Sequence, residues 1–306
     1  MDKKIAFLGT SNFAVPILKS IYQSDYKISC VFSQPPRKSN RGHKLNKSPI
    51  HLLSEELGIQ IKTPEYIEKE IDYIKSLDLD LAIVVAYGQI LSKDILSLSK
   101  NGFINIHASL LPKWRGAAPI QRSLINMDKI TGLSIMKINP KLDEGPVCNK
   151  YPLDILENEN AKSLANRLSN LAAEKILLDI ENIFQQKANF KKQNSSIATY
   201  AKKIQKIEGR INWNNEADKI LAKINGLYPQ PGAWFIFEND RHKILRATLS
   251  KNTMKPGEII DNELTISCGN RSIKVTEIQR EGKKPQKARD FLLGSKLKKG
   301  IILKNG

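Results

Sequence analysis

The sequence contains few cysteines and few histidines. Cys30, Cys148 and Cys268 are the only cysteines among 306 residues, and they are far apart, with no CxxC pair. An odd number of widely spaced cysteines gives no disulfide framework and no zinc knuckle. No set of His, Cys, Asp and Glu has the spacing of metal ligands, so we expect no metal site. This cysteine usage is typical of a protein in a reducing compartment.

Long hydrophobic runs are also absent. No apolar stretch reaches the ~18 residues that a membrane helix needs. The apolar run at residues 5–8 is too short for a signal peptide and ends in a turn sequence. We therefore expect a soluble, cytoplasmic protein that has no membrane contact and acts as a monomer.

Acidic residues are scarce relative to basic ones. The chain has 49 Lys and Arg against 31 Asp and Glu, a net charge of +18. Residues 205–306 carry 20 basic and 11 acidic residues, so one third of the chain holds half of the net charge. A lysine-rich genome could produce part of this excess, but it would not concentrate it. The balance indicates a polyanionic partner, nucleic acid before membrane.

The first part of the chain alternates apolar β-branched runs with helical periodicity, which predicts a doubly wound, mostly parallel α/β sheet. The expected strands are 5–8, 28–32, 59–61, 79–86, 103–106, 133–138 and 147–155, and the expected helices are 13–22, 50–57, 64–76, 90–98, 121–126 and 160–187. Gly9 starts a turn after the first strand, but the other two glycines of a G-x-G-x-x-G loop are absent, which disfavours nicotinamide binding.

The pattern changes after Ile204. Short strands recur at 234–237, 243–248, 257–260, 265–268 and 273–278, separated by turn residues. This spacing predicts a small all-β, OB-like barrel. We expect a catalytic domain at 1–189, a polar linker at 190–207 and the barrel at 208–306.

The segment from 105 to 121 carries the clearest chemical signal, reading NIHASLLPKWRGAAPIQ. Asn105 and His107 are two apart on a predicted strand and therefore point to the same face. An amide can donate to a developing oxyanion, and an imidazole can move a proton near neutral pH. The pair is suited to acyl chemistry. We expect the other three histidines, His43, His51 and His242, at the surface.

The same segment resembles the folate-dependent formyltransferases, whose signature is Asn-x-His followed by Ser-Leu-Leu-Pro and Arg-Gly-Ala-Ala-Pro-Ile. Segments 208–213, 228–234 and 282–285 match in the C-terminal part. The resemblance thus covers nearly the full length. It implies a Rossmann-like formyltransferase domain, 10-formyltetrahydrofolate as co-substrate, no metal, and, for the members most like this chain, initiator methionyl-tRNA as the acceptor in translation initiation.

The resemblance also implies site residues. Asp143, followed by x-Gly, completes a catalytic set with Asn105 and His107, although Lys141 stands where the family has a glycine and Pro146 follows Gly145. Residues in two segments match the folate-contacting loops: Tyr87, Gly88, Ile90 and Leu91, and Ser109, Leu110, Leu111 and Pro112. For Ile90 and Leu91, a place in a helix core is an equal alternative.

The loop at 34–49 is long for a β–α connection and holds five basic residues and no acidic one. Long loops in compact domains are usually functional or disordered. A solvated charge run is one explanation. The resemblance implies another, a loop that enters the acceptor end of tRNA with Arg41 as its main contact. The predicted nucleic-acid contacts are Arg37, Lys38, Arg41, Lys44 and Lys47.

Two other functions remain open from the sequence. A small-molecule formyltransferase acting on a nucleotide or an amino sugar would share the Asn-His-Asp set, but it would not need the basic loop and barrel. A non-catalytic RNA-binding protein would need the charge but not the intact Asn105, His107 and Asp143.

Overall fold

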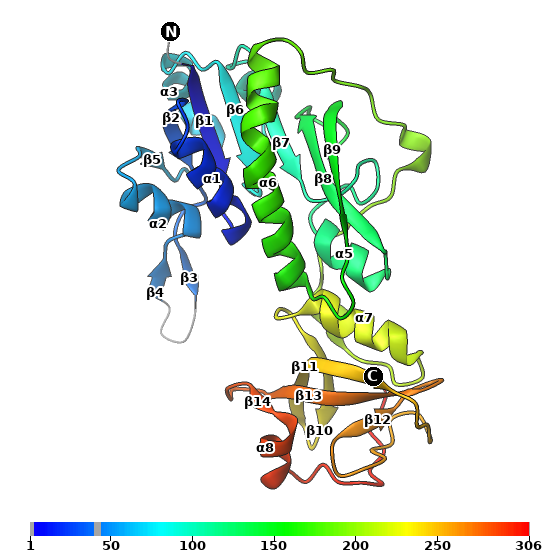
Figure 1. The fold of residues 1–306 in the computed structure, drawn as a ribbon. Coiled ribbons are helices and arrows are strands. Elements are labelled where there is room, and N and C mark those ends of the chain that lie inside the picture. The colour runs from blue at the N-terminus through cyan, green and yellow to red at the C-terminus, as the bar shows by residue number, and fades with distance from the viewer. Residues whose placement is uncertain (1–2, 40–43, 306) are drawn as a thin grey trace. The chain divides into compact units, whose positions relative to one another are not determined.

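The computed structural model of the chain describes residues 3–39 and 44–305 (Figure 1). The chain divides into two compact units. The first comprises 1–116, 132–153 and 165–200, and the second comprises 117–131, 154–164 and 201–306.

The first unit is built on a seven-stranded sheet with the order β5-β2-β1-β6-β7-β8-β9. Its strands are β1 (Lys4–Gly9), β2 (Lys27–Phe32), β5 (Ile61–Lys62), β6 (Leu81–Val85), β7 (Phe103–His107), β8 (Ile130–Lys137) and β9 (Val147–Asp154). The strands from β5 to β7 pair in parallel, and β8 runs antiparallel to β7. Every residue of β6 is buried, as expected for a central strand covered on both faces.

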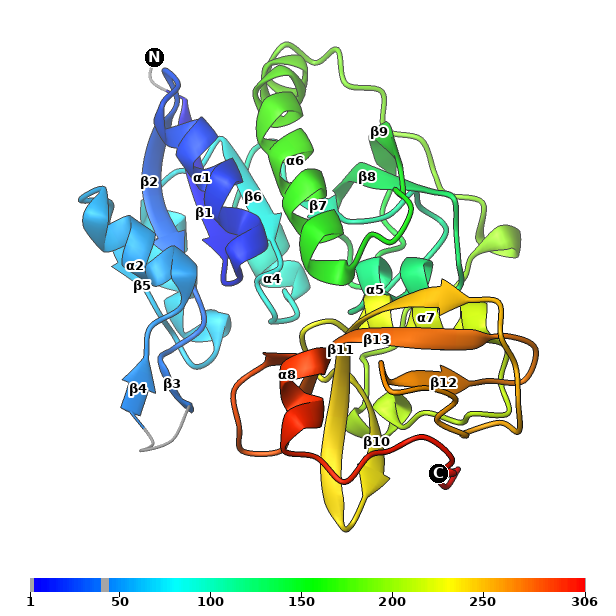
Figure 2. The ribbon, with the colours of Figure 1, turned by 60° about the horizontal axis from the view of Figure 1, so that its bottom comes forward.

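Helices cover both faces of this sheet (Figures 1 and 2). They are η1 (Asn12–Ala14), α1 (Val15–Tyr22), α2 (Pro49–Glu56), η2 (Ile67–Glu70), α3 (Ile71–Ser76), α4 (Lys93–Leu96) and α6 (Ala161–Phe184). On one face α1 and α6 lie side by side, joined by the Ser20 hydroxyl, which donates to the Ala173 carbonyl at 2.8 Å. On the other face, α3 and α4 pack on a core that includes Ala6 and Leu8 of β1.

The prediction of a helix over 90–98 was wrong in extent. Only α4 (Lys93–Leu96) is helical, because Ser92 caps it by accepting a hydrogen bond from the Ile95 amide at 3.4 Å. Residues 87–91 form an irregular loop between β6 and this helix. The predicted helix over 64–76 likewise begins only at Ile67, as the short η2 followed by α3.

The second unit contains a five-stranded antiparallel sheet with the order β10-β11-β13-β12, with β14 on β13. Its elements are α5 (Pro119–Ile125), η4 (Lys206–Gly209), α7 (Ala217–Leu227), β10 (Ala233–Phe237), β11 (Asp240–Ser250), β12 (Thr265–Ser267), β13 (Ser272–Arg280), β14 (Gln286–Lys287) and α8 (Ala288–Leu293). Helix η3 (Ser195–Ile197) belongs to the first unit. The predicted fold class, a mostly parallel α/β sheet followed by an OB-like β-domain, is confirmed.

The core of the second unit is closed by side chains from its sheet and from α7. Trp213 is fully buried and meets the Phe235 ring edge-on, with ring centroids 5.8 Å apart. His242 was predicted at the surface, and this is wrong. Its ring is 4% exposed and stacks on Phe235 at 5.4 Å. Burial lowers the pKa of His242, which keeps the ring neutral in this apolar setting.

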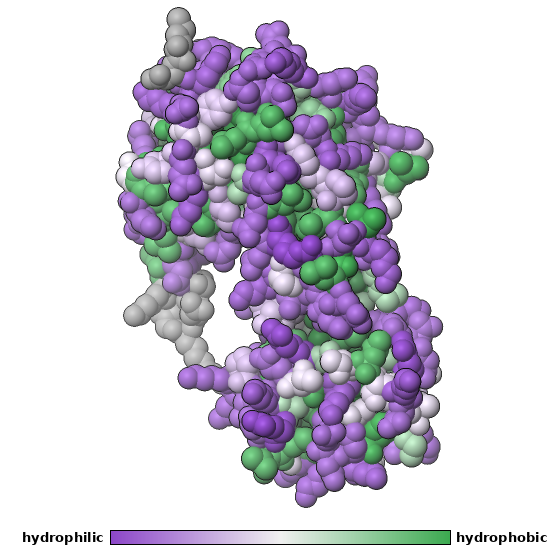
Figure 3. Space-filling model, in the orientation of Figure 1, coloured by the Kyte–Doolittle hydropathy of each residue, from purple (hydrophilic) through white to green (hydrophobic). Residues whose placement is uncertain are grey.

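The exterior is mainly hydrophilic on the side shown in Figure 3, with hydrophobic residues scattered in small groups. Within the described ranges, no helix combines the length and the apolar character needed to cross a bilayer.

Candidate active site

Strand β7 places two polar side chains beside each other at the end of a buried apolar run. His107 is 6% exposed, and Asn105 is half-buried. The side-chain amide of Asn105 has no hydrogen-bond partner in the described part of the chain. Its donors are therefore open to a ligand on this face of the strand.

The imidazole of His107 is held between a carbonyl and a carboxylate. Its Nε2 lies 2.9 Å from the Trp114 carbonyl oxygen, and its Nδ1 lies 3.6 Å from Asp143 Oδ2. A carbonyl can only accept, so Nε2 carries the hydrogen in this contact. In the neutral ring the other nitrogen, Nδ1, therefore carries the lone pair, and it faces Asp143.

Trp114 presents its carbonyl from an uncommon backbone conformation. Its φ is 61°, in the left-handed region, and its amide donates to Thr199 Oγ1 at 2.9 Å. A non-glycine residue holds this conformation only where its surroundings fix it. The loop after β7 is thus set to direct a carbonyl at His107.

The loop between β8 and β9 brings the predicted Asp143 to His107. It starts at Lys137, which pairs with Ile104, three residues before His107 on β7, so the loop must fold back along the sheet. Asp143 has a φ of 50°, and its Oδ2 accepts a hydrogen bond from the Gly116 amide at 2.8 Å. The structure therefore brings the three predicted catalytic residues to one place.

Gly145 allows this loop to fold back. A Cβ built on it would lie 1.7 Å from the Lys137 carbonyl oxygen, so no side chain fits there. The Asp-x-Gly pattern in the sequence thus reflects close approach of two backbone segments.

The predicted segment 109–112 follows β7 directly. Ser109 and Leu111 are fully buried, and Leu110 is half-buried. Ser134 fixes the segment, because its hydroxyl donates to the Ser109 carbonyl at 2.7 Å and accepts from the Leu111 amide at 3.0 Å. The Leu111–Pro112 peptide is cis.

The predicted residues at 87–91 divide into two groups. Tyr87 and Leu91 have their side chains in the core under the sheet, at 2% and 4% exposure. Gly88 has a φ of 87°, and Ile90 is 84% exposed. A ligand at this loop could therefore touch the backbone at Gly88 and the side chain of Ile90, while Tyr87 supports the loop from below.

Gln34 is a candidate site residue that the sequence did not single out. It follows β2 at the same edge of the sheet, and its Nε2 is buried without a hydrogen-bond partner in the described ranges. A Cβ on Gly88 would lie 3.8 Å from this nitrogen. A buried donor without an acceptor is costly unless a ligand satisfies it. The sequence offered only a glutamine at the start of a loop.

The basic loop at 34–49 contains a hairpin, β3 (Arg37–Ser39) and β4 (Lys44–Asn46), paired so that Arg37 faces Asn46 and Lys38 faces Leu45. The Arg37 guanidinium donates to Gln34 Oε1 at 2.9 Å. Lys47 forms an ion pair with Glu55 at 2.6 Å.

The predicted nucleic-acid contacts in this loop also include Lys38, Arg41 and Lys44. Arg41 lies outside the described residues. Lys38 and Lys44 lie on the paired strands, one on each side of the hairpin.

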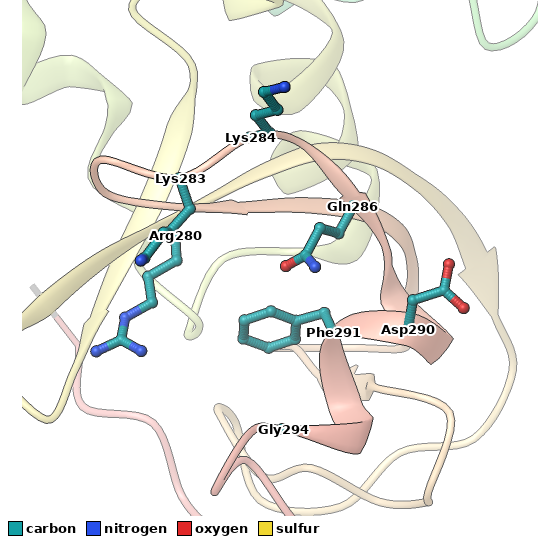
Figure 4. Close-up of a pocket in the computed structure, with 7 residues that line it drawn as sticks. All are labelled: Arg280, Lys283, Lys284, Gln286, Asp290, Phe291 and Gly294. Carbon is teal, nitrogen blue, oxygen red and sulfur yellow. The ribbon is translucent and has the colours of Figure 1, made fainter.

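The second unit has a basic hollow of its own, of about 360 Å³. Figure 4 shows Gln286 and Phe291 facing one another across it, whereas Lys284 and Asp290 point away. Arg280 is paired with Asp240. The lining is Arg280, Lys283, Lys284, Gln286, Asp290, Phe291 and Gly294.

A second hollow adjoins the first, and Arg280 lines both. In it, Arg241 lies over the Trp234 ring at 4.4 Å, a cation–π geometry. Partial burial lowers the pKa of Lys243 beside it. In residues 3–39 and 44–305, no group of three or more His, Cys, Asp or Glu side chains could hold a metal ion.

Comparison with known proteins matches both parts of the chain. Residues 3–180 match the formyl transferase family, and residues 203–296 match its C-terminal domain. The methionyl-tRNA formyltransferase of Pelagibacter ubique (strain HTCC1062) is 56% identical over 309 residues, covering 100% of both chains.

Solved structures share the fold at lower identity. The N-formyltransferase of Helicobacter canadensis, in complex with folinic acid and dTDP-3-aminofucose, has a TM-score of 0.70 at 19% identity, with 90% of this chain and 99% of that chain covered. HypX of Aquifex aeolicus with tetrahydrofolic acid has a TM-score of 0.67 at 13% identity, covering 100% of this chain and 51% of that one. These likenesses concern the fold alone. The two family matches and the full-length identity of 56% show that the chain belongs to the formyl transferase family, in the branch of the methionyl-tRNA formyltransferases.

Proposed function

We propose that the chain transfers the formyl group of 10-formyltetrahydrofolate to the amino group of methionine on initiator methionyl-tRNA. The observation that carries the proposal is the meeting of Asn105, His107 and Asp143 in a chain that is 56% identical, over its full length, to a methionyl-tRNA formyltransferase. Formyl transfer to an amine needs an oxyanion donor and a proton acceptor, and these side chains can supply both.

The edge of the sheet fits a folate. Gln34 Nε2 lacks a partner in the described ranges, Gly88 exposes backbone, and Ile90 offers an apolar surface. Flat cofactors bind in apolar slots with a few polar anchors, commonly beyond the carboxyl ends of parallel strands. When bound, 10-formyltetrahydrofolate supplies an electrophilic formyl carbon. We place it against the segments 87–91 and 109–112.

Each catalytic side chain then has one task. The open amide of Asn105 donates to the formyl oxygen, where negative charge develops as the amine attacks. His107 takes the amine's proton on Nδ1, because Nε2–H is held by the Trp114 carbonyl. Asp143 faces Nδ1 and stabilises the imidazolium that forms. The bond between the formyl carbon and N10 of the folate then breaks, and the imidazolium returns its proton to that nitrogen, so no covalent enzyme intermediate is needed.

Contact with tRNA is assigned to the basic loop and to the second unit. We propose residues 1–189 as the catalytic domain, 190–207 as the connection and 208–306 as the tRNA-binding domain. The higher charge density of residues 205–306 supports this division, since phosphate contacts need clustered Lys and Arg. We further propose that the chain works as a monomer in the cytoplasm. Sedimentation of the purified protein tests whether it is a monomer.

A formylation assay separates this proposal from its rivals. The purified chain is given 10-formyltetrahydrofolate with initiator methionyl-tRNA, with elongator methionyl-tRNA, or with a dTDP-linked amino sugar. We expect rapid formylation of the initiator tRNA and little of the others. Formylation of the sugar alone would support a small-molecule enzyme, and tRNA binding without any formylation would support a non-catalytic RNA-binding protein.

A further inference from the structure

The segment at 191–199 follows α6 and its trailing turn, and it runs alongside both loops that meet at His107. We refer to it as the strap. At one end, the Lys191 amide and carbonyl form two hydrogen bonds with Val147, each at 2.9 Å. At the other end, the Thr199 carbonyl accepts from the Arg115 amide at 2.9 Å, and the Thr199 amide donates to the Pro112 carbonyl at 3.2 Å. The strap is therefore bound to the loop after β7 and to the start of β9.

Gln193 is the strap residue that reaches the Asp143 loop. Its Nε2 donates to the carbonyl oxygens of Asp143 and Gly145, each at 2.8 Å. Its Oε1 accepts a hydrogen bond from Arg115 Nε at 3.0 Å. Both amide hydrogens and the amide oxygen are thus used, which fixes the side chain in one orientation.

Arg115 links this amide back to the histidine. It is 1% exposed and immediately follows Trp114, whose carbonyl binds His107. Its guanidinium also lies 3.3 Å from Ser195 Oγ and 3.4 Å from Glu144 Oε1. Moving this buried guanidinium away from these partners would be costly, because it would leave a buried charge unpaired.

These contacts connect His107 to the Trp114–Arg115 backbone, Arg115 to Gln193, and Gln193 to Asp143, which in turn faces His107. Asp143 sits at a φ of 50°, which a non-glycine residue keeps only when neighbouring groups hold it. Within the described residues, Gln193 is the side chain whose donors hold the Asp143 carbonyl, while the Asp143 carboxylate is held by Gly116.

We propose that Gln193 is a positioning residue for formyl transfer, which holds the Asp143 loop so that the carboxylate faces His107 Nδ1. The inference rests on the proposed function. Gln193 does not touch the reacting atoms. It acts through the carbonyl groups of Asp143 and Gly145, so its loss should slow the chemical step without weakening substrate binding.

The test compares Gln193→Glu and Gln193→Ala with Gln185→Ala in the full-length chain. Gln193→Glu keeps the size of the side chain and the acceptor for Arg115 but removes both donors to the loop. Gln185 is an exposed glutamine near the end of α6, where it contacts Glu181, and serves as the matched control. Formylation of initiator methionyl-tRNA is measured at pH 8, together with amide hydrogen exchange over 114–118 and 142–147.

We expect both Gln193 variants to lower kcat about 10- to 100-fold, the scale of a misplaced catalytic group, with each KM changed less than threefold. Exchange at the Gly116 amide should rise, because its acceptor on Asp143 is no longer held. Gln185→Ala should match the parent chain in both measurements.

Three outcomes would overturn the inference. One is a parent-like kcat in Gln193→Glu, which would mean that the donors to the loop do not matter. Another is a rise in KM by the same factor as the fall in kcat, together with a lower Tm, which would indicate a general structural role. The third is unchanged exchange at Gly116. If the parent chain itself formylates no tRNA, the proposed function fails instead, and the exchange measurement still decides whether Gln193 holds the loop.

Discussion

At the scale of single residues, the geometry around His107 supports different tasks for the three side chains of the proposed catalytic set. The Trp114 carbonyl fixes which imidazole nitrogen carries a hydrogen, and Asp143 faces the other. On the same face of β7, the side-chain amide of Asn105 donates to no group among the residues that the structure describes. In the proposed mechanism, the oxyanion and proton-transfer tasks are therefore divided between neighbours on one strand.

This division of tasks predicts that two isosteric substitutions lower kcat for different reasons. Asn105→Asp removes the amide donors and adds a charge opposed to the developing oxyanion, so we expect kcat to fall at least 10²–10³-fold. Asp143→Asn keeps the size of the side chain but removes the charge that stabilises the imidazolium. Single-turnover formylation of initiator methionyl-tRNA measures both losses, and circular dichroism checks folding. Near-parent turnover in either variant would remove that residue from the catalytic set.

Asp179 on α6 is a buried carboxyl outside the site, and burial raises its pKa. It is 1% exposed, with Tyr151 donating to Oδ1 at 2.9 Å and Asn149 donating to the same oxygen. Because the folded state binds this proton more tightly than the unfolded state, its contribution to stability is complete below the unfolded pKa of about 3.9 and is lost as pH rises through the folded pKa.

We therefore expect Asp179→Asn to stabilise the protein relative to the parent chain at neutral pH, and less so near pH 4. Each unit by which the pKa is raised corresponds to about 1.4 kcal/mol of unfolding free energy at high pH. Urea denaturation of both proteins between pH 4 and 8 measures the difference. A difference that does not change with pH would show that Asp179 does not titrate in this range.

At the scale of elements, the sequence predicted the strands and helices that have a clear apolar periodicity. It did not predict features that depend on contacts between distant segments. Strands β1, β6 and β7 were predicted because their runs are apolar and β-branched. Helix α7 was missed although its buried residues recur at helical spacing, because the surrounding turn residues suggested only strands. The strap was predicted as a plain linker region, since nothing in residues 191–199 signals their partners at 112–115 and 143–147.

The site shows the same limit. Asn105 and His107 could be paired from their spacing on a strand, and Asp143 from the family resemblance. Gln34 and Gln193 could not be found, because a glutamine in a loop has no distinguishing pattern until the fold supplies its neighbours. His242 was misplaced because its apolar partners, Phe235 and Phe291, lie on other elements.

The hairpin formed by β3 and β4 gives an element-scale prediction. A contact with phosphate alone weakens all tRNAs alike, whereas a contact that enters the acceptor end should distinguish them. We expect Arg41→Ala to lower activity on initiator methionyl-tRNA much more than Lys47→Ala, because Lys47 is already paired with Glu55. Initial rates on initiator and elongator methionyl-tRNA measure the comparison. Equal losses on both tRNAs would reduce the loop to a nonspecific cationic patch.

At the scale of the whole molecule, the charge of the chain must serve a partner as well as solubility. The two parts of the chain divided at residue 205 carry equal net charge, although the second is half as long. In that second part many cations are paired, as Arg280 is with Asp240, Lys274 with Glu263 and Lys296 with Glu238. Surface ion pairs of this kind contribute little to stability and are screened by salt. The Lys and Arg residues in excess of the acidic residues are available to phosphates.

Binding of tRNA should therefore weaken steeply with salt, since each phosphate contact releases counterions and adds about 0.7–0.9 to the slope of log affinity against log salt. Lys283 and Lys284, which line the basic hollow of the second unit, are the residues to test. We expect Lys283→Ala combined with Lys284→Ala to lower the slope by about 1 to 2, because up to two phosphate contacts are lost. Lys75→Ala, on the exposed side of α3, is the matched control and should leave the slope unchanged. Filter binding of initiator tRNA is measured between about 50 and 300 mM salt, about the range in which such slopes are measured. It gives the slope for the double variant and for the control. A slope that stays the same in the double variant, or falls equally in the control, would place the tRNA contact elsewhere on the molecule.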